Sequence, residues 1–162
     1  MRIRLARVVA VLAALALVGA GVALAAAVTV RSAKNPTLGK IVVNSRGFTL
    51  YHNTKERGSI KCTGACTATW PPLIVGKSAK VKAGPGIRAA KLGKIKRPDG
   101  RFQVTYFGKP LYRYAPDGKP GKINGEGIGG IWFALKTTGA LAKTTSSTTT
   151  NTTTTSTIPG YP

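Results

Sequence analysis

The stretch QVTYFGKPLYRYAPD, residues 103–117, carries the clearest strand-turn-strand signal in the chain. Residues 103–106 are rich in β-formers, and residues 107–110 combine a glycine and a proline in the manner of a tight turn. Residues 111–114 resume an extended pattern, which Pro116 and the residues around it close. The pattern predicts two adjacent strands joined by a turn.

A fainter copy of this pattern lies sixty-one positions upstream. Both copies contain, in the same order, a valine, a glycine, a Leu-Tyr pair and a later tryptophan. These residues are Val43, Gly47, Leu50, Tyr51 and Trp70 in the first copy, and Val104, Gly108, Leu111, Tyr112 and Trp132 in the second. The shared order predicts a duplicated unit.

The second copy places Tyr112, Tyr114 and Asp117 at the spacing Tyr-x-Tyr-x-x-Asp. With these residues the chain resembles the bacterial secreted-repeat family, lipoprotein-like proteins that share the motif Tyr-x-(Phe/Trp/Tyr)-x-x-Asp. The first copy keeps Tyr51 and has Asn53 and Glu56 at the other two positions. The resemblance covers about residues 38–135 and also includes Cys62-Thr-Gly-Ala-Cys66, Trp70-Pro-Pro, Arg97-Pro-Asp-Gly and residues 124–132. It implies an exported protein and no established biochemical activity.

The N-terminus has the features of an export signal. Three arginines, Arg2, Arg4 and Arg7, precede residues 8–30, which contain no charge and become alanine-rich at residues 23–27. This predicts a signal peptide over residues 1–27. The alternative is an uncleaved membrane anchor to about residue 30, because a stretch of this length can span a hydrocarbon core of about 30 Å. No cysteine lies near the cleavage triplets, so the lipid attachment found in the family is not expected here.

The rest of the chain divides by composition. We expect a linker at residues 28–36, a β-repeat domain at 37–137 and a disordered Thr/Ser-rich tail at 138–162. Within the domain, repeat one is predicted at about 38–75 and repeat two at about 92–135, with a basic connection at 76–91. No stretch after the leader sustains helical periodicity. The predicted fold class is all-β, a small sandwich or barrel of two pseudo-repeats behind an N-terminal hydrophobic leader helix, with Trp70 and Trp132 in equivalent core positions.

The only two cysteines, Cys62 and Cys66, predict one small disulfide in an oxidising compartment. The alternative is a redox or metal site that uses this pair and His52, the only histidine. Haem attachment and thioredoxin chemistry require a different cysteine spacing, and zinc requires further ligands. We therefore expect a structural disulfide, no metal and no cofactor.

Tyr112, Tyr114 and Asp117 fit two interpretations. The alternation of the tyrosines places both rings on one face of a strand, which favours packing, and Asp117 before a glycine is a common turn residue. The alternative is a small-ligand pocket around Tyr112 and Asp117. The glycine-rich residues 125–130 precede a strand rather than a helix, so they do not form a dinucleotide fingerprint. They are expected to let the backbone pass close to the aromatic core.

Enzymatic chemistry finds little support in this composition. The chain contains four acidic residues, one histidine and no serine in a nucleophile-elbow context. We expect a protein that is not an enzyme.

Charge is the remaining functional signal. The formal net charge is +21, and removal of the leader with its three arginines leaves about +18. Such a surface attracts polyanions, and outside the membrane these are anionic surface polymers or lipid headgroups. Export argues against a dedicated nucleic-acid role, and a basic surface without a selected partner is the alternative. The predicted polyanion-binding residues are Lys77, Lys80, Lys82, Arg88, Lys91, Lys94, Lys96, Arg97 and Arg101.

The sequence thus predicts a non-catalytic, exported module of the cell envelope with an interaction or structural role and adhesion to anionic polymers. An extracytoplasmic redox or metal-associated accessory protein and a small-ligand-binding module are the alternatives. An uncleaved leader would be its only route into a membrane.

Overall fold

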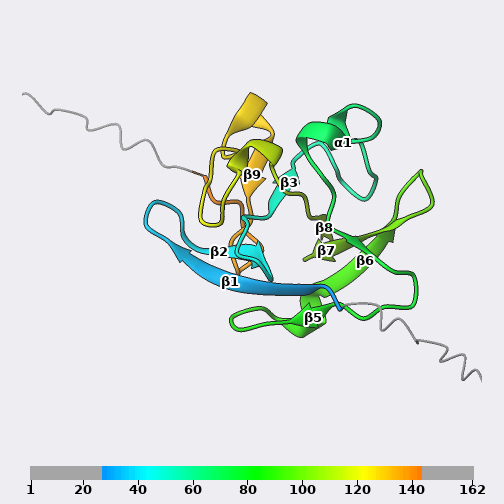
Figure 1. Cartoon of the computed structure of the whole chain (residues 1–162), viewed down its shortest axis with the longest axis horizontal. Helices are drawn as coiled ribbons and strands as arrows, with labels where there is room; N and C mark the ends of the chain where they lie inside the picture. Colours follow the sequence, from blue (N-terminus) through cyan, green and yellow to red (C-terminus); the bar gives the residue numbers. More distant parts are fainter. Residues whose placement is uncertain (1–26, 144–162) are drawn as a thin grey trace, which may run out of the picture.

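The computed structural model describes residues 27–143. The predicted leader and most of the predicted tail lie outside the described residues. Within them the chain forms short strands joined by turns, together with one helical turn, α1 (Cys66–Thr69), and three 3-10 turns (Figure 1). The strands are β1 (Thr29–Asn35), β2 (Gly39–Asn44), β3 (Tyr51–Asn53), β4 (Ile74–Val75), β5 (Lys82–Ala83), β6 (Leu92–Lys96), β7 (Phe102–Tyr106), β8 (Lys109–Pro110) and β9 (Trp132–Ala134). The 3-10 turns are η1 (Ala89–Lys91), η2 (Ala115–Asp117) and η3 (Ile128–Gly130).

The strands form three small sheets. Their strand orders are β2-β1-β5, β3-β9 and β4-β7-β6, and β8 pairs with β7. All pairings are antiparallel except that of β1 with β5. The predicted predominance of strands is confirmed, whereas the predicted barrel is wrong, because these sheets do not close on one another. No helix within residues 27–143 is long and apolar enough to cross a membrane.

Two expected boundaries are also wrong. The predicted linker at 28–36 contains β1, which the turn at Asn35 folds back onto β2. The Asn35 carboxamide oxygen accepts the backbone N–H groups of Thr37 and Leu38, at 3.0 and 2.9 Å, and so fixes this turn. The domain also continues beyond residue 137, because Ala142 is fully buried and donates its N–H to the carbonyl of Ala134 at 2.7 Å.

Each half of the domain contributes one segment that hydrogen-bonds between two segments of the other half. In the first half, Val42 donates its N–H to the carbonyl of Leu135 at 2.7 Å, and Leu135 donates to the carbonyl of Leu50 at 3.0 Å. Leu135 comes from the second half of the chain, so it lies between two segments of the first.

The second half repeats this arrangement with a segment from the first. Val104 donates its N–H to the carbonyl of Leu73, and Leu73 donates to the carbonyl of Leu111, both at 2.9 Å. The structural counterpart of Val104 is therefore Val42 rather than Val43. The sequence alignment was shifted here because the first turn, closed by the pair Val43 and Thr49, is longer than the turn closed by Thr105 and Pro110.

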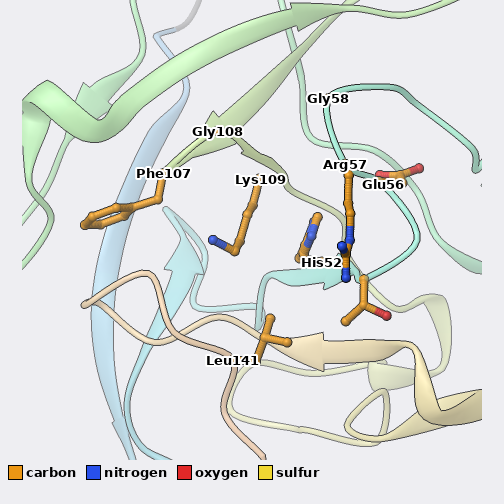
Figure 2. Close-up of a pocket in the computed structure, with 9 residues that line it drawn as sticks. His52, Glu56, Arg57, Gly58, Phe107, Gly108, Lys109 and Leu141 are labelled. Atoms are coloured by element: carbon orange, nitrogen blue, oxygen red, sulfur yellow. The ribbon is translucent and has the colours of Figure 1, made fainter.

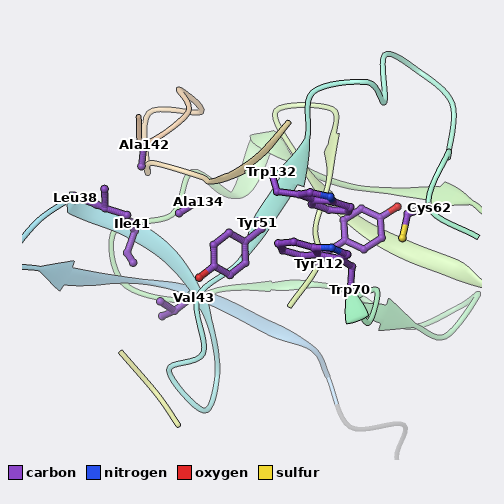
Figure 3. Packing of buried hydrophobic residues seen from close by; sticks show 10 residues of the cluster. All are labelled: Leu38, Ile41, Val43, Tyr51, Cys62, Trp70, Tyr112, Trp132, Ala134 and Ala142. Atoms are coloured by element: carbon purple, nitrogen blue, oxygen red, sulfur yellow. The ribbon is translucent and has the colours of Figure 1, made fainter. Parts of the chain in front are cut away.

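The two tryptophans meet where the halves interlock (Figure 3). The rings of Trp70 and Trp132 are stacked with centroids 3.9 Å apart and an angle of 5° between their planes. Tyr51 contacts Trp70 edge-on at 5.5 Å, and Tyr112 contacts Trp132 edge-on at 5.1 Å. Both tryptophans are buried, and each of the two pairs joins residues of one repeat. The tryptophan stack is thus the contact that joins the two pairs.

This stack leads to a prediction about stability. Trp70→Ala removes a buried ring that packs on Trp132, and we expect a loss of about 3–5 kcal/mol in the free energy of unfolding. Denaturant titration measures it, and near-UV circular dichroism should lose the signal of the coupled rings. The matched control is Phe133→Ala, which changes a half-buried ring beside Trp132 and should cost less. Equal losses for the two variants would contradict a central role of the stack.

Candidate functional site

The family-motif residues form buried bonds between the halves. Tyr51 donates its hydroxyl to Asp117 Oδ2, and Tyr112 donates its hydroxyl to Glu56 Oε1, both at 2.8 Å. All four residues are buried. Burial, together with the facing carboxylates, raises the pKa of both tyrosines, so their hydroxyls remain donors. Burial also raises the pKa of Asp117, while the bond from Tyr51 opposes that change.

The same carboxylates anchor the loops that follow them. Asp117 Oδ1 accepts the N–H of Asn124 at 2.9 Å. Glu56 Oε1 accepts the N–H groups of Lys61 and Cys62, at 2.8 and 2.9 Å. Each carboxylate therefore fixes a loop of its own repeat to a tyrosine of the other repeat.

This arrangement leaves little access to the predicted ligand pocket. Tyr112 is 0% exposed and Asp117 is 2% exposed, and their polar atoms are bonded within the protein. Tyr114 packs against Trp70 with ring centroids 4.5 Å apart. The contacts of all three residues stabilise the fold.

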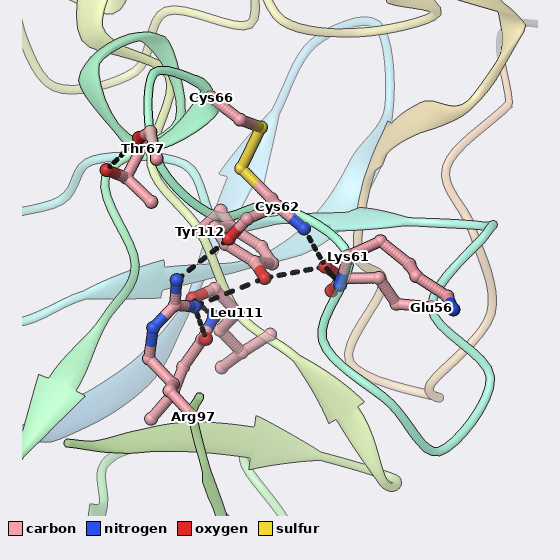
Figure 4. Close-up of a disulfide and its surroundings, with 10 residues drawn as sticks. Glu56, Lys61, Cys62, Cys66, Thr67, Arg97, Leu111 and Tyr112 are labelled. Atoms are coloured by element: carbon pink, nitrogen blue, oxygen red, sulfur yellow. Dashed lines mark hydrogen bonds between the residues drawn. A yellow bond between two sulfur atoms is a disulfide. The ribbon is translucent and has the colours of Figure 1, made fainter. Parts of the chain in front are cut away.

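The predicted disulfide is present. Cys62 and Cys66 are bonded, with Cα atoms 5.3 Å apart, and they close the loop that leads into α1 (Figure 4). In the described part of the chain, no three histidine, cysteine, aspartate or glutamate side chains are grouped as metal ligands. The chain supplies no free cysteine.

Arg97 lies beneath this loop and is not a surface cation. Its guanidinium donates to the carbonyl of Cys62 at 2.8 Å, to the Gln103 carboxamide and, at 3.5 Å, to the Tyr112 hydroxyl (Figure 4). Its side chain is 0% exposed. The prediction that Arg97 binds polyanions is therefore wrong, because a buried guanidinium requires these internal acceptors.

The other predicted cations are exposed. Arg101 forms an ion pair with Asp99 at 2.8 Å, and this hydrogen bond holds the pKa of Asp99 well below its usual range. Lys94 donates to the carbonyls of Lys77 and Ala79, at 2.6 and 3.1 Å. The members that reach solvent are Lys77, Lys80, Lys82, Arg88, Lys91, Lys94, Lys96 and Arg101.

Three adjoining surface hollows collect several of these cations. One, of about 300 Å³, is lined by Lys80 and Lys94, and it shares Leu92 and Gly93 with a second hollow of about 430 Å³. The second is lined by Lys91 and in turn shares two residues with a third hollow of about 320 Å³. The shared residues are Phe107 and Gly108. We call the three hollows together the basic groove.

Phe107 lies where the second and third hollows meet. The Lys91 ammonium is 5.5 Å from the centre of its ring, which allows a cation–π contact. The backbone of Phe107 has a φ of +50°, a left-handed conformation that is unusual for a phenylalanine. Its ring covers Gly139, where a Cβ atom would lie 2.6 Å from the ring, so only glycine fits there.

The third hollow contains cations that the sequence did not indicate. Arg57 and Lys109 line it with His52 and Thr54 (Figure 2). His52 is buried, and its Nδ1–H donates to the carbonyl of Pro110 over 3.4 Å. Burial lowers the pKa of His52, so the ring is neutral at pH 7. Arg57 and Lys109 lie outside the lysine-rich stretch, and only the pairing of the halves brings them to this face.

The comparison with known families concerns the second half of the domain. Residues 93–136 match a family model described as a secreted repeat of unknown function. This is the family that the tyrosine motif indicated, and its description as a secreted repeat agrees with the predicted extracytoplasmic location. The first copy, with Asn53 and Glu56 in the motif, precedes the matched residues. No curated protein and no solved structure matches the chain.

The bonds between tyrosine and carboxylate can be tested singly. Tyr51→Phe removes the donor to the buried Asp117 carboxylate and should lower the free energy of unfolding by about 1.5–3 kcal/mol. Chemical denaturation measures this loss. Tyr114→Phe is the control, because the Tyr114 hydroxyl has no hydrogen bond within residues 27–143 in the structure. A similar effect of both variants would refute a specific role for the bond.

A second prediction separates the buried arginine from its exposed neighbour. Arg97→Gln leaves buried acceptors unpaired and should cost on the order of 3 kcal/mol of stability. Arg101→Gln removes an exposed ion pair and should cost less than about 1 kcal/mol. Thermal and denaturant unfolding compare them. An Arg97 variant as stable as the Arg101 variant would show that the internal network contributes little.

Proposed function

We propose, from the match of residues 93–136 to a secreted repeat and from the charge of the basic groove, that the protein is a non-catalytic module of the cell envelope that adheres to anionic surface polymers. The observation that carries the proposal is the composition of the groove. Five cations line it: Arg57, Lys80, Lys91, Lys94 and Lys109.

The groove has one acidic residue, Glu56, beside these five cations, so its net charge stays positive. Glu56 lines the third hollow, but it is 3% exposed and its Oε1 accepts the hydrogen bond from Tyr112. The groove therefore attracts anions over its whole length. Between exposed charges this attraction is screened beyond about 8 Å at physiological salt, so binding requires contact with the groove itself.

The form of the groove favours a polymer over a single small anion. Its hollows adjoin through shared walls at Leu92, Gly93, Phe107 and Gly108, so an extended chain can contact several cations in succession. Phe107, next to Lys91, offers a half-buried ring against which a sugar or polyol can pack. Polymers of sugar or polyol units joined by phosphate or bearing carboxylates combine these features.

The redox alternative gains no comparable support. Cys62 is 2% exposed and bonded to Cys66, and the Cys62 carbonyl is held by Arg97. These contacts favour a disulfide that shapes the loop.

Paired charge reversals test the proposal. Lys80→Glu with Lys91→Glu changes the groove, whereas Lys34→Glu with Lys40→Glu makes the same change of net charge at exposed sites on β1 and β2. Binding to a glycerol phosphate polymer and to heparin is measured at about 0.15 M salt. The groove pair should weaken binding at least about tenfold, equivalent to about 1.4 kcal/mol, and the control pair much less.

Two results would count against the proposal. An equal loss for both pairs would mean that net charge alone attracts the polymer. Failure of the unmodified protein to bind either polymer at this salt concentration would remove adhesion as its function.

A further inference from the structure

The third hollow of the basic groove differs from the rest in its chemistry. It lies between the loop after β3 and the turn before β8, and it combines several kinds of group (Figure 2). Arg57 and Lys109 provide positive charge, Phe107 and Leu141 provide apolar walls, and His52 provides an imidazole. The Glu56 carboxylate also lines the hollow, but its Oε1 accepts the bond from Tyr112 and its Oε2 is buried, so two cations face one inward carboxylate. Its volume of about 320 Å³ is similar to that of the other two hollows and holds one small unit, so its chemistry and not its size sets it apart.

At the position that the repeat makes equivalent to this hollow, an arginine contacts an aromatic ring. Tyr51 and Tyr112 exchange backbone hydrogen bonds at 2.8 and 2.9 Å, so the residues that follow them, His52 and Arg113, occupy equivalent positions. The Arg113 guanidinium of the second half lies over the ring of Phe48 of the first half, 5.7 Å from its centre. In the equivalent pair, His52 of the first half faces Lys109 of the second, which is the counterpart of Phe48. The hollow therefore arises where this arginine-aromatic contact has been replaced by His52 and Lys109.

The strained backbone of Phe107 lies at the same hollow. A left-handed conformation of a non-glycine residue is unfavourable and persists only where the surrounding structure imposes it. Here the two-residue hairpin turn between Tyr106 and Lys109 imposes it, since Phe107 and Gly108 both have positive φ. The Phe107 ring then packs over Gly139 and against the Tyr106 ring, with centroids 4.8 Å apart. The protein thus holds an aromatic wall at the hollow at the expense of local strain.

The hydrogen-bonding state of His52 defines a second requirement of the ligand. Because Nδ1–H donates to the Pro110 carbonyl and the ring is neutral, Nε2 is left as an acceptor. A partner for Nε2 must be a donor such as a hydroxyl. A partner for Arg57 and Lys109 must be an anion, for which phosphate suits both charges.

We propose that the third hollow binds a single phosphorylated sugar or polyol unit, the terminal unit of the polymer that the basic groove holds. Phosphate contacts Arg57 and Lys109, a hydroxyl donates to His52, and the carbon face of the unit packs on Phe107 and Leu141. The inference rests on the proposed function and adds recognition of the polymer end to it.

Calorimetric titration of the full chain with three probes tests the site. The probes are glycerol phosphate, inorganic phosphate and glycerol. Glycerol phosphate should bind at one site per chain and at least about tenfold more tightly than either fragment, because it alone satisfies both the cations and His52. Equal affinity for glycerol phosphate and inorganic phosphate, or no binding of glycerol phosphate, would overturn the proposal.

Variants separate this site from the rest of the groove. Arg57→Met with Lys109→Met should weaken glycerol phosphate binding at least about tenfold, whereas Lys55→Met, at an exposed neighbouring site, should not. Lys80→Glu with Lys94→Glu, which changes the first hollow alone, should weaken polymer binding and leave glycerol phosphate binding within about twofold. The unfolding temperature of each variant shows whether it is folded. If the Arg57 and Lys109 double variant is misfolded, His52→Gln replaces it, and this variant should also weaken glycerol phosphate binding.

The outcomes distinguish the two proposals. Polymer binding that survives while glycerol phosphate fails to bind would refute recognition of the end and leave adhesion standing. If the protein binds neither the polymer nor glycerol phosphate, both adhesion and recognition of the polymer end are refuted.

Discussion

The exchange between the two halves at Tyr51 and Tyr112 is the constraint on which the rest of the structure depends. Each tyrosine bonds to the backbone of the other, and each hydroxyl reaches the carboxylate of the opposite repeat, Asp117 or Glu56. These bonds are buried, so breaking one leaves a charged or polar group without water. Neither half retains its full set of partners alone, which explains why such short strands form a single ordered domain.

A shared interior limits where function can evolve. The motif tyrosines and their carboxylates are occupied by the fold, and the disulfide and Arg97 brace the loop next to them. Chemistry directed at a ligand must therefore come from the outer residues of the repeat, where the two halves differ. Gly125 illustrates the constraint inside: a Cβ atom there would lie 2.9 Å from the ring of Tyr51, so this position of the glycine-rich loop must stay small.

Sequence reasoning succeeded where local patterns determine structure. The strand predicted at residues 103–106 is present as β7 (Phe102–Tyr106), and the disulfide followed from two cysteines in an exported chain. It failed where contacts with residues distant in sequence determine whether a side chain is buried. Arg97 resembles its basic neighbours in sequence, but its side chain is buried and donates hydrogen bonds to Cys62 and Gln103. The third hollow was missed for the same reason, because only the interlocking of the halves brings Arg57 and Lys109 together.

The location of the basic groove follows from one difference between the repeats. β1 and β6 begin equivalent hairpins, and the outer edge of β1 is paired with β5. The outer edge of β6 has no strand beside it in the described part of the chain, and an open edge invites pairing with another protein. Lys94 and Lys96 on this strand, with Lys91 before it, oppose such pairing because their charges would be desolvated. The same lysines concentrate positive charge along the edge, and two of them, Lys91 and Lys94, line the basic groove to which we assign polymer binding.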